Sequence, residues 1–361
     1  MGFILYNEIE WRELNEKHDK ETIKELLSDK IDELNLPLPM RELSLDDSCQ
    51  DFENLLNFDE STILVDQPFF TRYDYEYPLS EKVIKTVSIG NKSSDYFHQE
   101  NRWKCDSINA PSPYRSWHIK KFRMTLFNAL WTLKIKQVDD KTLRSCIGLR
   151  KYIASQFRPS AAKCLYNHFN AKNVLDFSSG WGDRLSGFMA SNAESYYGID
   201  PNNTLIDGYN KQIEQFNSGK TIELISECAE NVTYNKKFDF IFTSPPYFNI
   251  ERYTQEDNQS FKKYRKFNDW LNKFLYVTIE KAWDALEFNG ILAINISDVY
   301  SLHTVHPICD NMNRFISSLP NSNYEGCYGY EMRKRPNSGA LKNKVGTFAE
   351  PIWIWRKYDN G

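Results

Sequence analysis

Segments that would direct a protein into a membrane or out of the cell are missing from this sequence. No run of about 18 apolar residues occurs, so no segment is expected to span a membrane. The first residues contain no basic stretch and no small-residue cleavage site, and Glu8 and Glu10 would interrupt the apolar core of a signal peptide. The sequence therefore predicts a cytoplasmic protein.

Clustered cysteines are also missing. The seven cysteines are never closer than 18 residues apart, which excludes zinc sites of the Cys-x-x-Cys type. An odd, scattered set is typical of reduced thiols in the cytosol. His303 and His306 form a His-x-x-His pair, but Pro307 follows directly and no third ligand is near. No metal site is predicted.

Charge is distributed unevenly, although the net charge is only −4. Residues 1–60 contain 17 acidic and 6 basic residues, whereas residues 101–165 contain 14 basic and 3 acidic ones. The acidic segment is either an exposed helical face or a cover for the basic one. A basic stretch interleaved with aromatic residues is typical of a surface that follows phosphates and stacks on bases. The aromatic residues concerned are Trp103, Tyr114, Trp117, Phe122, Phe127 and Trp131.

The hydrophobic pattern changes near residue 170. Before it, helices are expected over 8–34, 118–135 and 140–170, the last interrupted at Arg158-Pro159, with a short strand at 63–65. After it, short apolar runs alternate with segments of helical spacing. The expected strands are 173–177, 195–200, 222–225, 238–243 and 290–296, and the expected helices are 183–191, 204–217, 268–287 and 306–318.

This alternation predicts an α/β architecture with a doubly wound, mostly parallel sheet. Two further strands, at 326–332 and 350–357, are expected to form a terminal antiparallel pair. We expect residues 1–150 to form a mainly helical accessory region, with an acidic part at 1–60 and a basic aromatic part at 101–150, and residues 151–361 to form the main domain.

A glycine loop follows the first strand of that domain. The segment Asp176-Phe-Ser-Ser-Gly180-Trp-Gly182 lies where a strand turns into a helix, and glycine lets a backbone pass close to a ligand there. A dinucleotide site would require a third glycine at position 185, but that residue is leucine and the next glycine is Gly187. The missing glycine disfavours NAD.

The pattern Asp-x-x-x-Gly-x-Gly instead resembles motif I of the methyltransferases that use S-adenosyl-L-methionine (SAM). On this resemblance the methionine part of SAM lies against five residues, namely Asp176, Ser178, Gly180, Trp181 and Gly182.

The next two strands extend the resemblance. Asp200 ends the second strand, where an acidic side chain can accept hydrogen bonds from both ribose hydroxyls of SAM. After the third strand, Cys228 and Ala229 stand where the family contacts adenine. The family often has an aspartate near Cys228, and here Glu230 is only a weak substitute, so backbone contacts are expected.

The fourth strand runs into Thr243-Ser244-Pro245-Pro246-Tyr247-Phe248. A Pro-Pro pair by itself indicates only a rigid loop. This segment, however, resembles motif IV of the amino-methyltransferases, in the Thr-Ser-Pro-Pro-Tyr form associated with cytosine N4 enzymes. The resemblance implies that the Ser244 hydroxyl and the Pro245 carbonyl bind the target amino group, that Pro246 stiffens the loop, and that Tyr247 stacks on the base.

Phe157 and Pro159, just before the glycine loop, resemble motif X, which closes over the methionine end of SAM. The order of the motifs is then the gamma-like one of a Rossmann-like class I methyltransferase. Too few residues separate motifs I and IV to contain a recognition domain. Target recognition is therefore expected within residues 60–150, with contributions from the loops at 250–267 and 333–344.

The predicted activity is methylation of an exocyclic amino group in DNA, most simply cytosine N4, on a base that is flipped out or single-stranded. No Pro-Cys nucleophile of the C5-cytosine type is present. Adenine N6, an RNA base and a protein glutamine remain alternatives, as does a catalytically idle protein that binds SAM and nucleic acid. The sequence indicates neither the recognition sequence nor the oligomeric state, nor whether the enzyme belongs to a restriction–modification pair.

Overall fold

The computed structural model describes residues 2–301, 303–332 and 344–359. Most of the basic loop expected to assist target recognition at 333–344 therefore lies outside the described residues. The chain divides into two compact units, which are described one at a time. The first comprises residues 1–44, 100–155 and 252–254, and the second comprises residues 45–99, 156–251 and 255–361.

This division differs from the expected one, in which residues 1–150 form a single accessory region. Residues 45–99 belong to the second unit because they contain strands that pair with its sheet.

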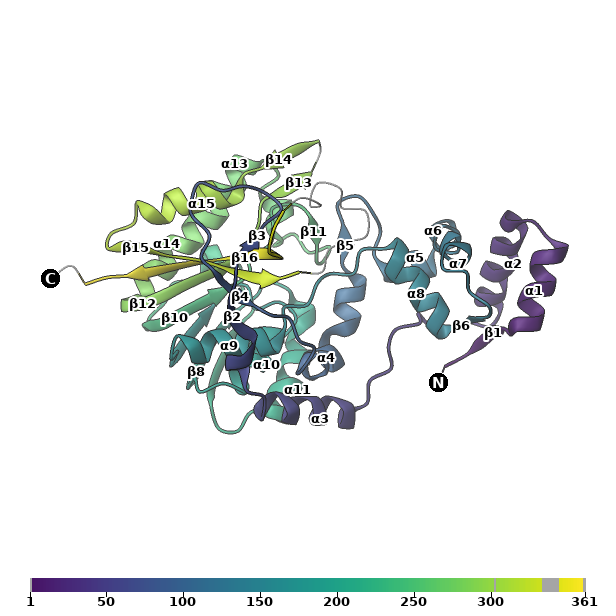
Figure 1. Cartoon of the computed structure of the whole chain (residues 1–361), viewed down its shortest axis with the longest axis horizontal. Helices are drawn as coiled ribbons and strands as arrows, with labels where there is room; N and C mark the ends of the chain where they lie inside the picture. The colour runs from purple at the N-terminus through teal and green to yellow at the C-terminus, as the bar shows by residue number, and fades with distance from the viewer. Residues whose placement is uncertain (1, 302, 333–343, 360–361) are drawn as a thin grey trace. The chain divides into compact units, whose positions relative to one another are not determined.

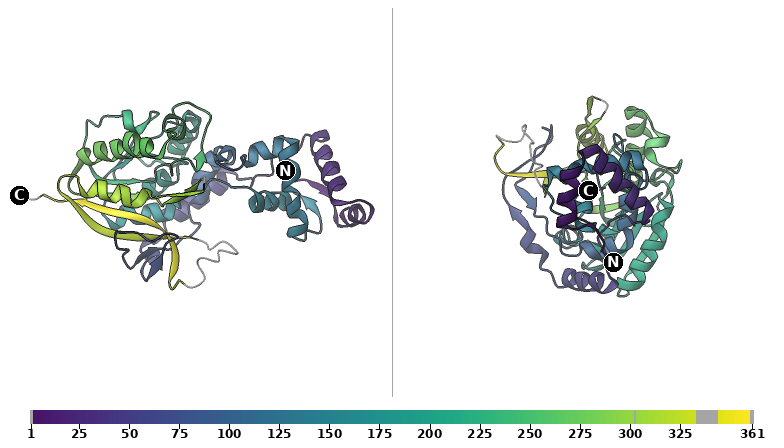
Figure 2. Two further views of the ribbon diagram at one scale, coloured as in Figure 1. Left: turned by 90° about the horizontal axis from the view of Figure 1, so that it is seen from above. Right: turned by 90° about the vertical axis from the view of Figure 1, so that its right-hand side faces the viewer.

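The first unit is a helical bundle with a small two-stranded sheet. Its helices are α1 (Glu8–Lys17), α2 (Lys20–Glu33), α5 (Pro113–His118), α6 (Lys120–Leu126), α7 (Asn128–Thr132) and α8 (Asp140–Arg150), and its strands are β1 (Ile4–Tyr6) and β6 (Val138–Asp139). Helices α1 and α2 lie side by side (Figures 1 and 2). The single helix predicted over 8–34 is broken because Asp19 caps a new helix by accepting a hydrogen bond from the Thr22 amide at 2.9 Å.

Most aromatic residues of the basic stretch belong to the core of this unit. Trp103, Trp117 and Phe127 are buried, and the Trp117 indole donates a hydrogen bond to the Leu36 carbonyl at 3.1 Å. Of the six aromatics, Tyr114 alone is more than a third exposed. The expectation of a base-stacking surface is therefore wrong for Trp103, Trp117 and Phe127, since the hydrophobic effect places these rings in the core.

The acidic and basic segments pair with each other inside this unit. Lys120 and Arg123 of α6 form ion pairs with Asp29 and Asp32 of α2. Arg123 is only 2% exposed, and its Nε donates to the Ser28 hydroxyl at 2.9 Å. Both alternatives for the acidic segment therefore apply in part, because Asp29 and Asp32 pair with the basic stretch while the acidic side chains of α1 and α2 are exposed.

The second unit contains, among the described residues, a ten-stranded sheet in the order β2-β4-β15-β16-β12-β10-β7-β8-β9, with β3 paired to β16. Its strands are β2 (Leu64–Asp66), β3 (Phe69–Phe70), β4 (Lys82–Ile84), β7 (Asn173–Asp176), β8 (Ser195–Ile199), β9 (Thr221–Ile225), β10 (Phe238–Thr243), β12 (Leu286–Asn295), β15 (Ser322–Glu331) and β16 (Thr347–Lys357).

Neighbouring strands from β9 to β12 are parallel, and β16 is antiparallel both to β12 and to β15. The expected parallel sheet with a terminal antiparallel pair is thus confirmed. The strand order is that of a Rossmann-like, doubly wound α/β fold. The addition of β4 and β2 beyond β15 was not predicted.

Helices cover both faces of this sheet, with α14 and α15 on one side and α9 and α10 on the other (Figure 1). The main helices are α3 (Leu45–Leu56), α9 (Pro159–His168), α10 (Asp183–Met189), α11 (Ile206–Phe216), α13 (Phe267–Trp270), α14 (Tyr276–Ala285) and α15 (Ile308–Ser317). A π-turn at Leu271–Leu275 separates α13 from α14, and α4 (Asn91–Lys104) crosses the boundary between the units at residue 99. Shorter elements are η1 (Glu60–Ile63), η2 (Asn203–Leu205), η3 (Ala229–Asn231), α12 (Ser260–Lys263), β13 (Val299–Ser301), β14 (Thr304–His306), β5 (Asp106–Ser107) and β11 (Glu251–Arg252).

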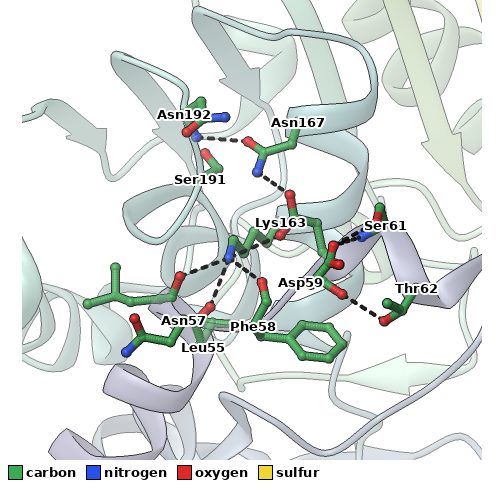
Figure 3. Close-up of polar contacts among 12 residues, drawn as sticks. Leu55, Asn57, Phe58, Asp59, Ser61, Thr62, Lys163, Asn167, Ser191 and Asn192 are labelled. Atoms are coloured by element: carbon green, nitrogen blue, oxygen red, sulfur yellow. Dashed lines mark hydrogen bonds and ion pairs between the residues drawn. The ribbon is translucent and has the colours of Figure 1, made fainter.

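A buried lysine of α9 attaches the segment after α3 to that helix (Figure 3). Lys163 of α9 donates hydrogen bonds to the carbonyls of Leu55, Leu56 and Phe58 at 3.0, 3.1 and 2.7 Å, and pairs with Glu60 at 3.0 Å. These partners satisfy a charge that burial would otherwise make costly. The segment leading to β2 is thereby held against α9.

Candidate active site at the carboxyl ends of the strands

Asp176 ends β7 and is fully buried. Its carboxylate accepts hydrogen bonds from Arg184 Nε at 2.7 Å and from the Tyr196 hydroxyl at 2.8 Å. It also accepts one from the Ser178 amide at 3.2 Å, while Arg184 donates to the Ser178 carbonyl. Because protein groups donate hydrogen bonds to its carboxylate, Asp176 stabilises the conformation of the glycine loop.

The two glycines of the loop have different surroundings. Both adopt the left-handed backbone conformation, with φ of 63° at Gly180 and 73° at Gly182. A Cβ at Gly182 would lie 2.3 Å from Gln212 Oε1 and 2.9 Å from the His98 ring, whereas one at Gly180 would meet no atom closer than 3.8 Å. Gly182 is therefore packed inside the protein, and the open side of the loop is at Gly180. Trp181, between them, is 9% exposed.

Asp200, at the end of β8, is partly exposed and lies against this open side. One carboxylate oxygen accepts the Gly180 amide and the other accepts the Asn202 amide, each at 2.9 Å. Burial raises the pKa of Asp200 to about 6. The Tyr209 hydroxyl donates to the Gly180 carbonyl, so the loop is fixed from two directions. Each Asp200 oxygen keeps a lone pair that could accept a ribose hydroxyl.

Gly187, which lies beyond position 185 where a dinucleotide motif would have its third glycine, has a packing role. A Cβ there would lie 2.6 Å from both the Ala162 Cβ and the Pro159 carbonyl oxygen. Gly187 thus lets α10 approach α9 closely.

The segment after β9 contributes Cys228 and Ala229, which are both buried. Glu230 is engaged by Lys263 and by the Tyr264 hydroxyl, the latter at 3.0 Å. It is therefore held by protein groups and is a poor substitute for an adenine-binding aspartate, and the expected backbone contacts of Cys228 and Ala229 stay a prediction.

Ser244, Pro245, Pro246 and Tyr247 directly follow β10. Ser244 Oγ lies 3.5 Å from Asn295 Oδ1, and the Tyr247 hydroxyl lies 3.3 Å from the Asn295 carbonyl oxygen. The next residue, Phe248, is buried and has a φ of 52°, so the chain turns sharply at this point. The turn keeps motif IV at the end of the strand.

Two residues of this cluster were not predicted from sequence. Asn295 ends β12, and Glu350 lies on β16 one strand further along the sheet. Glu350 is hydrogen-bonded to the side chains of Tyr247 and Asn295. A polar residue at the carboxyl end of the predicted 290–296 strand was a signal for Asn295. Glu350 had no comparable signal, because only the sheet register brings it to the site.

Phe157 and Pro159 lie beside these residues. The Phe157 ring stacks on Tyr330 at a centroid distance of 4.6 Å and contacts Phe242 edge-on at 5.2 Å. The Tyr330 hydroxyl accepts the Arg158 amide at 3.0 Å, and Pro159 is the first residue of α9. The segment before α9 is therefore anchored to β10 and β15.

Neither a metal cluster nor a membrane-spanning helix is found in the part of the chain that the structure describes. No group of three His, Cys, Asp or Glu side chains there could hold a metal ion. His306 packs against the rings of Phe248 and Phe267. No helix there is both long enough and apolar enough to cross a bilayer.

Comparison with known proteins finds similarity only among solved structures. No family model matches the sequence, and no curated protein does. TrmN from Thermus thermophilus is 14% identical over 55% of this chain and 48% of its own, with a TM-score of 0.37, so this chain spans about half of it. An rRNA methylase from Streptococcus thermophilus is 15% identical over 57% of this chain and 100% of its own, with a TM-score of 0.36. A SAM-dependent O-methyltransferase from Thermotoga maritima is 10% identical over 60% and 71%, with a TM-score of 0.37. The fold assignment rests on the strand order described above.

Proposed function

We propose that this chain is a SAM-dependent methyltransferase that methylates the exocyclic amino group of a nucleic-acid base. The first candidate is N4 of cytosine in DNA, and N6 of adenine is the second. The observation that carries the proposal is a shared sheet edge. Strands β7, β8 and β10 are parallel, so Gly180, Asp200 and Ser244 all lie at their carboxyl ends. Doubly wound sheets bind their ligands at that edge.

The residues present fit SAM. The open left-handed turn at Gly180 leaves room for a ligand beside the backbone, and the Asp200 carboxylate can accept hydrogen bonds from a ribose. When bound, SAM supplies an electrophilic methyl group on a sulfonium.

Ser244 and Pro245 suit an amino acceptor. An exocyclic amino nitrogen is a poor nucleophile because its lone pair is delocalised into the ring. Hydrogen bonds from its two N–H groups to Ser244 Oγ and to the Pro245 carbonyl would draw the nitrogen towards tetrahedral geometry and free that lone pair. Tyr247, which follows on the same rigid turn, would stack on the base.

We further propose that the first unit assists in binding the nucleic acid. Lys134 and Lys136 lie on an exposed loop of this unit and, within the described residues, make no ion pair. They are available to contact phosphates, unlike Lys120 and Arg123, which are paired with acidic side chains.

The test is to express the protein, digest host DNA and RNA to nucleosides, and quantify methylated species by mass spectrometry. Ser244→Ala should abolish the new species, and Ser318→Ala, at the exposed end of α15, should not. N4-methylcytosine in DNA would support the first candidate, and N6-methyladenine would support the second. A new species in RNA alone would reassign the substrate to RNA. With none in either pool, while the purified protein binds SAM, the nucleic-acid substrate would be rejected.

A further inference from the structure

A carboxyl group to which the proposed binding of SAM and base gives no role stands next to motif IV. Glu350 lies on β16, two residues before Ile352, which pairs with Asn295 in the antiparallel β12–β16 ladder. Because successive strand residues alternate between the two faces of a sheet, Glu350 and Ile352 point to the same face. Asn295 is the last residue of β12, so this register carries Glu350 just past the end of that strand.

A chain of hydrogen bonds joins Glu350 to the reacting end of motif IV. The Tyr247 side chain is hydrogen-bonded to both the Ser244 and the Glu350 side chains. Asn295 makes a further side-chain hydrogen bond to Glu350, and its Nδ2 also donates to the Pro351 carbonyl at 3.1 Å. In this structure the Tyr247 hydroxyl donates to the Asn295 carbonyl at 3.3 Å, and the Ser244 hydroxyl donates to Asn295 Oδ1 at 3.5 Å. Rotation of both hydroxyls about their C–O bonds would let Tyr247 accept a proton from Ser244 and donate its own to the Glu350 carboxylate.

The groups around Glu350 favour a carboxyl that exchanges a proton near neutrality. The titratable groups that face it are Tyr247 on the motif IV turn, Tyr330 on β15 and Glu251 after that turn. Burial, with a smaller contribution from the charge of Glu251, raises the pKa of Glu350 to about 7, against the lowering effect of the hydrogen bonds from Tyr247 and Asn295.

Resting on the proposed function, we propose that Glu350 is the final acceptor of the proton that the amino nitrogen loses when it is methylated. The bond between the nitrogen and the methyl carbon forms, the bond between that carbon and sulfur breaks, and the positive charge passes from sulfur to nitrogen. As the nitrogen–carbon bond forms, the nitrogen gives a proton to Ser244 Oγ, Ser244 gives its own to the Tyr247 hydroxyl, and Tyr247 gives its own to Glu350. Glu350 becomes neutral and later releases the proton to water.

Glu350 acts through other side chains and is therefore a positioning and relay residue. The relay requires an ionised carboxylate at the start of the step. Transfer should consequently slow about tenfold per pH unit below the pKa of Glu350, near 7, and level off above it.

The test is the single-turnover rate of methyl transfer to nucleic acid as a function of pH, measured together with SAM affinity. Glu350→Gln keeps a hydrogen-bonding side chain but cannot take up the proton. We expect it to slow transfer about 100-fold and to remove the acid limb of the profile, while SAM affinity is retained. Tyr247→Phe should also lose the acid limb, because it interrupts the relay. Glu350→Asp should restore part of the rate together with a pH-dependent limb.

Glu331→Gln is the matched control, since Glu331 is a carboxylate on the neighbouring strand β15 whose partners are Lys85 and the Thr86 amide. It should leave the rate and the profile unchanged. If the wild type transfers methyl groups and Glu350→Gln keeps the same rate and acid limb, the relay is wrong and the proposed function stands. If the wild type transfers none to DNA or RNA, the proposed function fails and the relay fails with it.

Discussion

At the scale of single residues, the glycine loop shows how one carboxylate can build a site while another remains available to a ligand. Asp176 is enclosed by Arg184 and Tyr196. Asp200 is partly exposed, and each of its carboxylate oxygens accepts one hydrogen bond from a backbone amide. The sequence motif treats both as cofactor residues. In the structure Asp176 holds the loop, whereas Asp200 can still accept a hydrogen bond from a polar ligand.

In the proposed site, this difference should give SAM affinity a pH dependence. Hydrogen bonds from ribose hydroxyls favour the ionised form of Asp200, whose pKa burial raises to about 6. Affinity should therefore be constant above that pH and weaken towards about tenfold per unit below it. Asp200→Asn should bind SAM more weakly and show no change in this range. Calorimetric titration between about pH 5 and pH 8 measures both effects.

Asp207→Asn is the control, because Asp207 is an exposed residue at the start of α11 paired with Lys211. Its affinity and pH dependence should match the wild type. An unchanged acid limb in Asp200→Asn would show that another group titrates.

At the scale of elements, the attachment of the segment after α3 depends on Lys163. Replacing this lysine by methionine would remove one hydrogen bond from each of three carbonyls and would leave Glu60 without its cation. We expect a loss of about 3 kcal/mol in the free energy of unfolding of the second unit, measured by urea denaturation. Lys172→Met, which removes a pair with Glu194 that is half exposed on both sides, should cost less than about 1 kcal/mol. Equal effects of the two variants would contradict the role given to Lys163.

Elements also show what the sequence could and could not reveal. Strands β7, β8, β9, β10 and β12 were predicted because each contains a short apolar run bounded by turns. The pairing of β4 with β15 was missed, since a three-residue strand within polar loops has no pattern of its own and forms only when the sheet offers an edge. For the same reason Ser244 could be named from a local motif but Glu350 could not. They are more than 100 residues apart and meet only through the order and register of β10, β12 and β16.

At the scale of the whole molecule, two partly buried carboxyls have raised pKa values, about 6 at Asp200 and about 7 at Glu350. A group whose pKa is higher in the folded state stabilises the fold below its unfolded pKa and loses that contribution as pH rises through the folded one. The contribution of these two carboxyls to the free energy of unfolding should therefore fall between about pH 4 and pH 7, that is, between their unfolded and folded pKa values. Glu350→Gln should flatten part of this fall, by about 1 to 3 kcal/mol, in denaturant titrations at both ends of the range. The same slope in variant and wild type would mean that Glu350 titrates normally.

Nucleic-acid binding is a property of the whole charge distribution, and the net charge of −4 by itself disfavours a polyanion. Binding then depends on basic groups that remain unpaired, of which Lys134 and Lys136 are exposed examples. Replacing both by alanine should weaken binding to duplex DNA of any sequence. If each contacts one phosphate, the slope of log affinity against log salt should fall by about 0.9 per lysine.

Fluorescence anisotropy at several salt concentrations measures this slope. Lys17→Ala is the control, because Lys17 belongs to the same unit but is paired with Glu13 on the acidic helix α1. Its slope should be that of the wild type. Should the double variant keep the wild-type affinity and slope, this loop does not contact DNA. Phosphate recognition would then have to come from basic residues other than Lys120 and Arg123, which form ion pairs with acidic residues of α2.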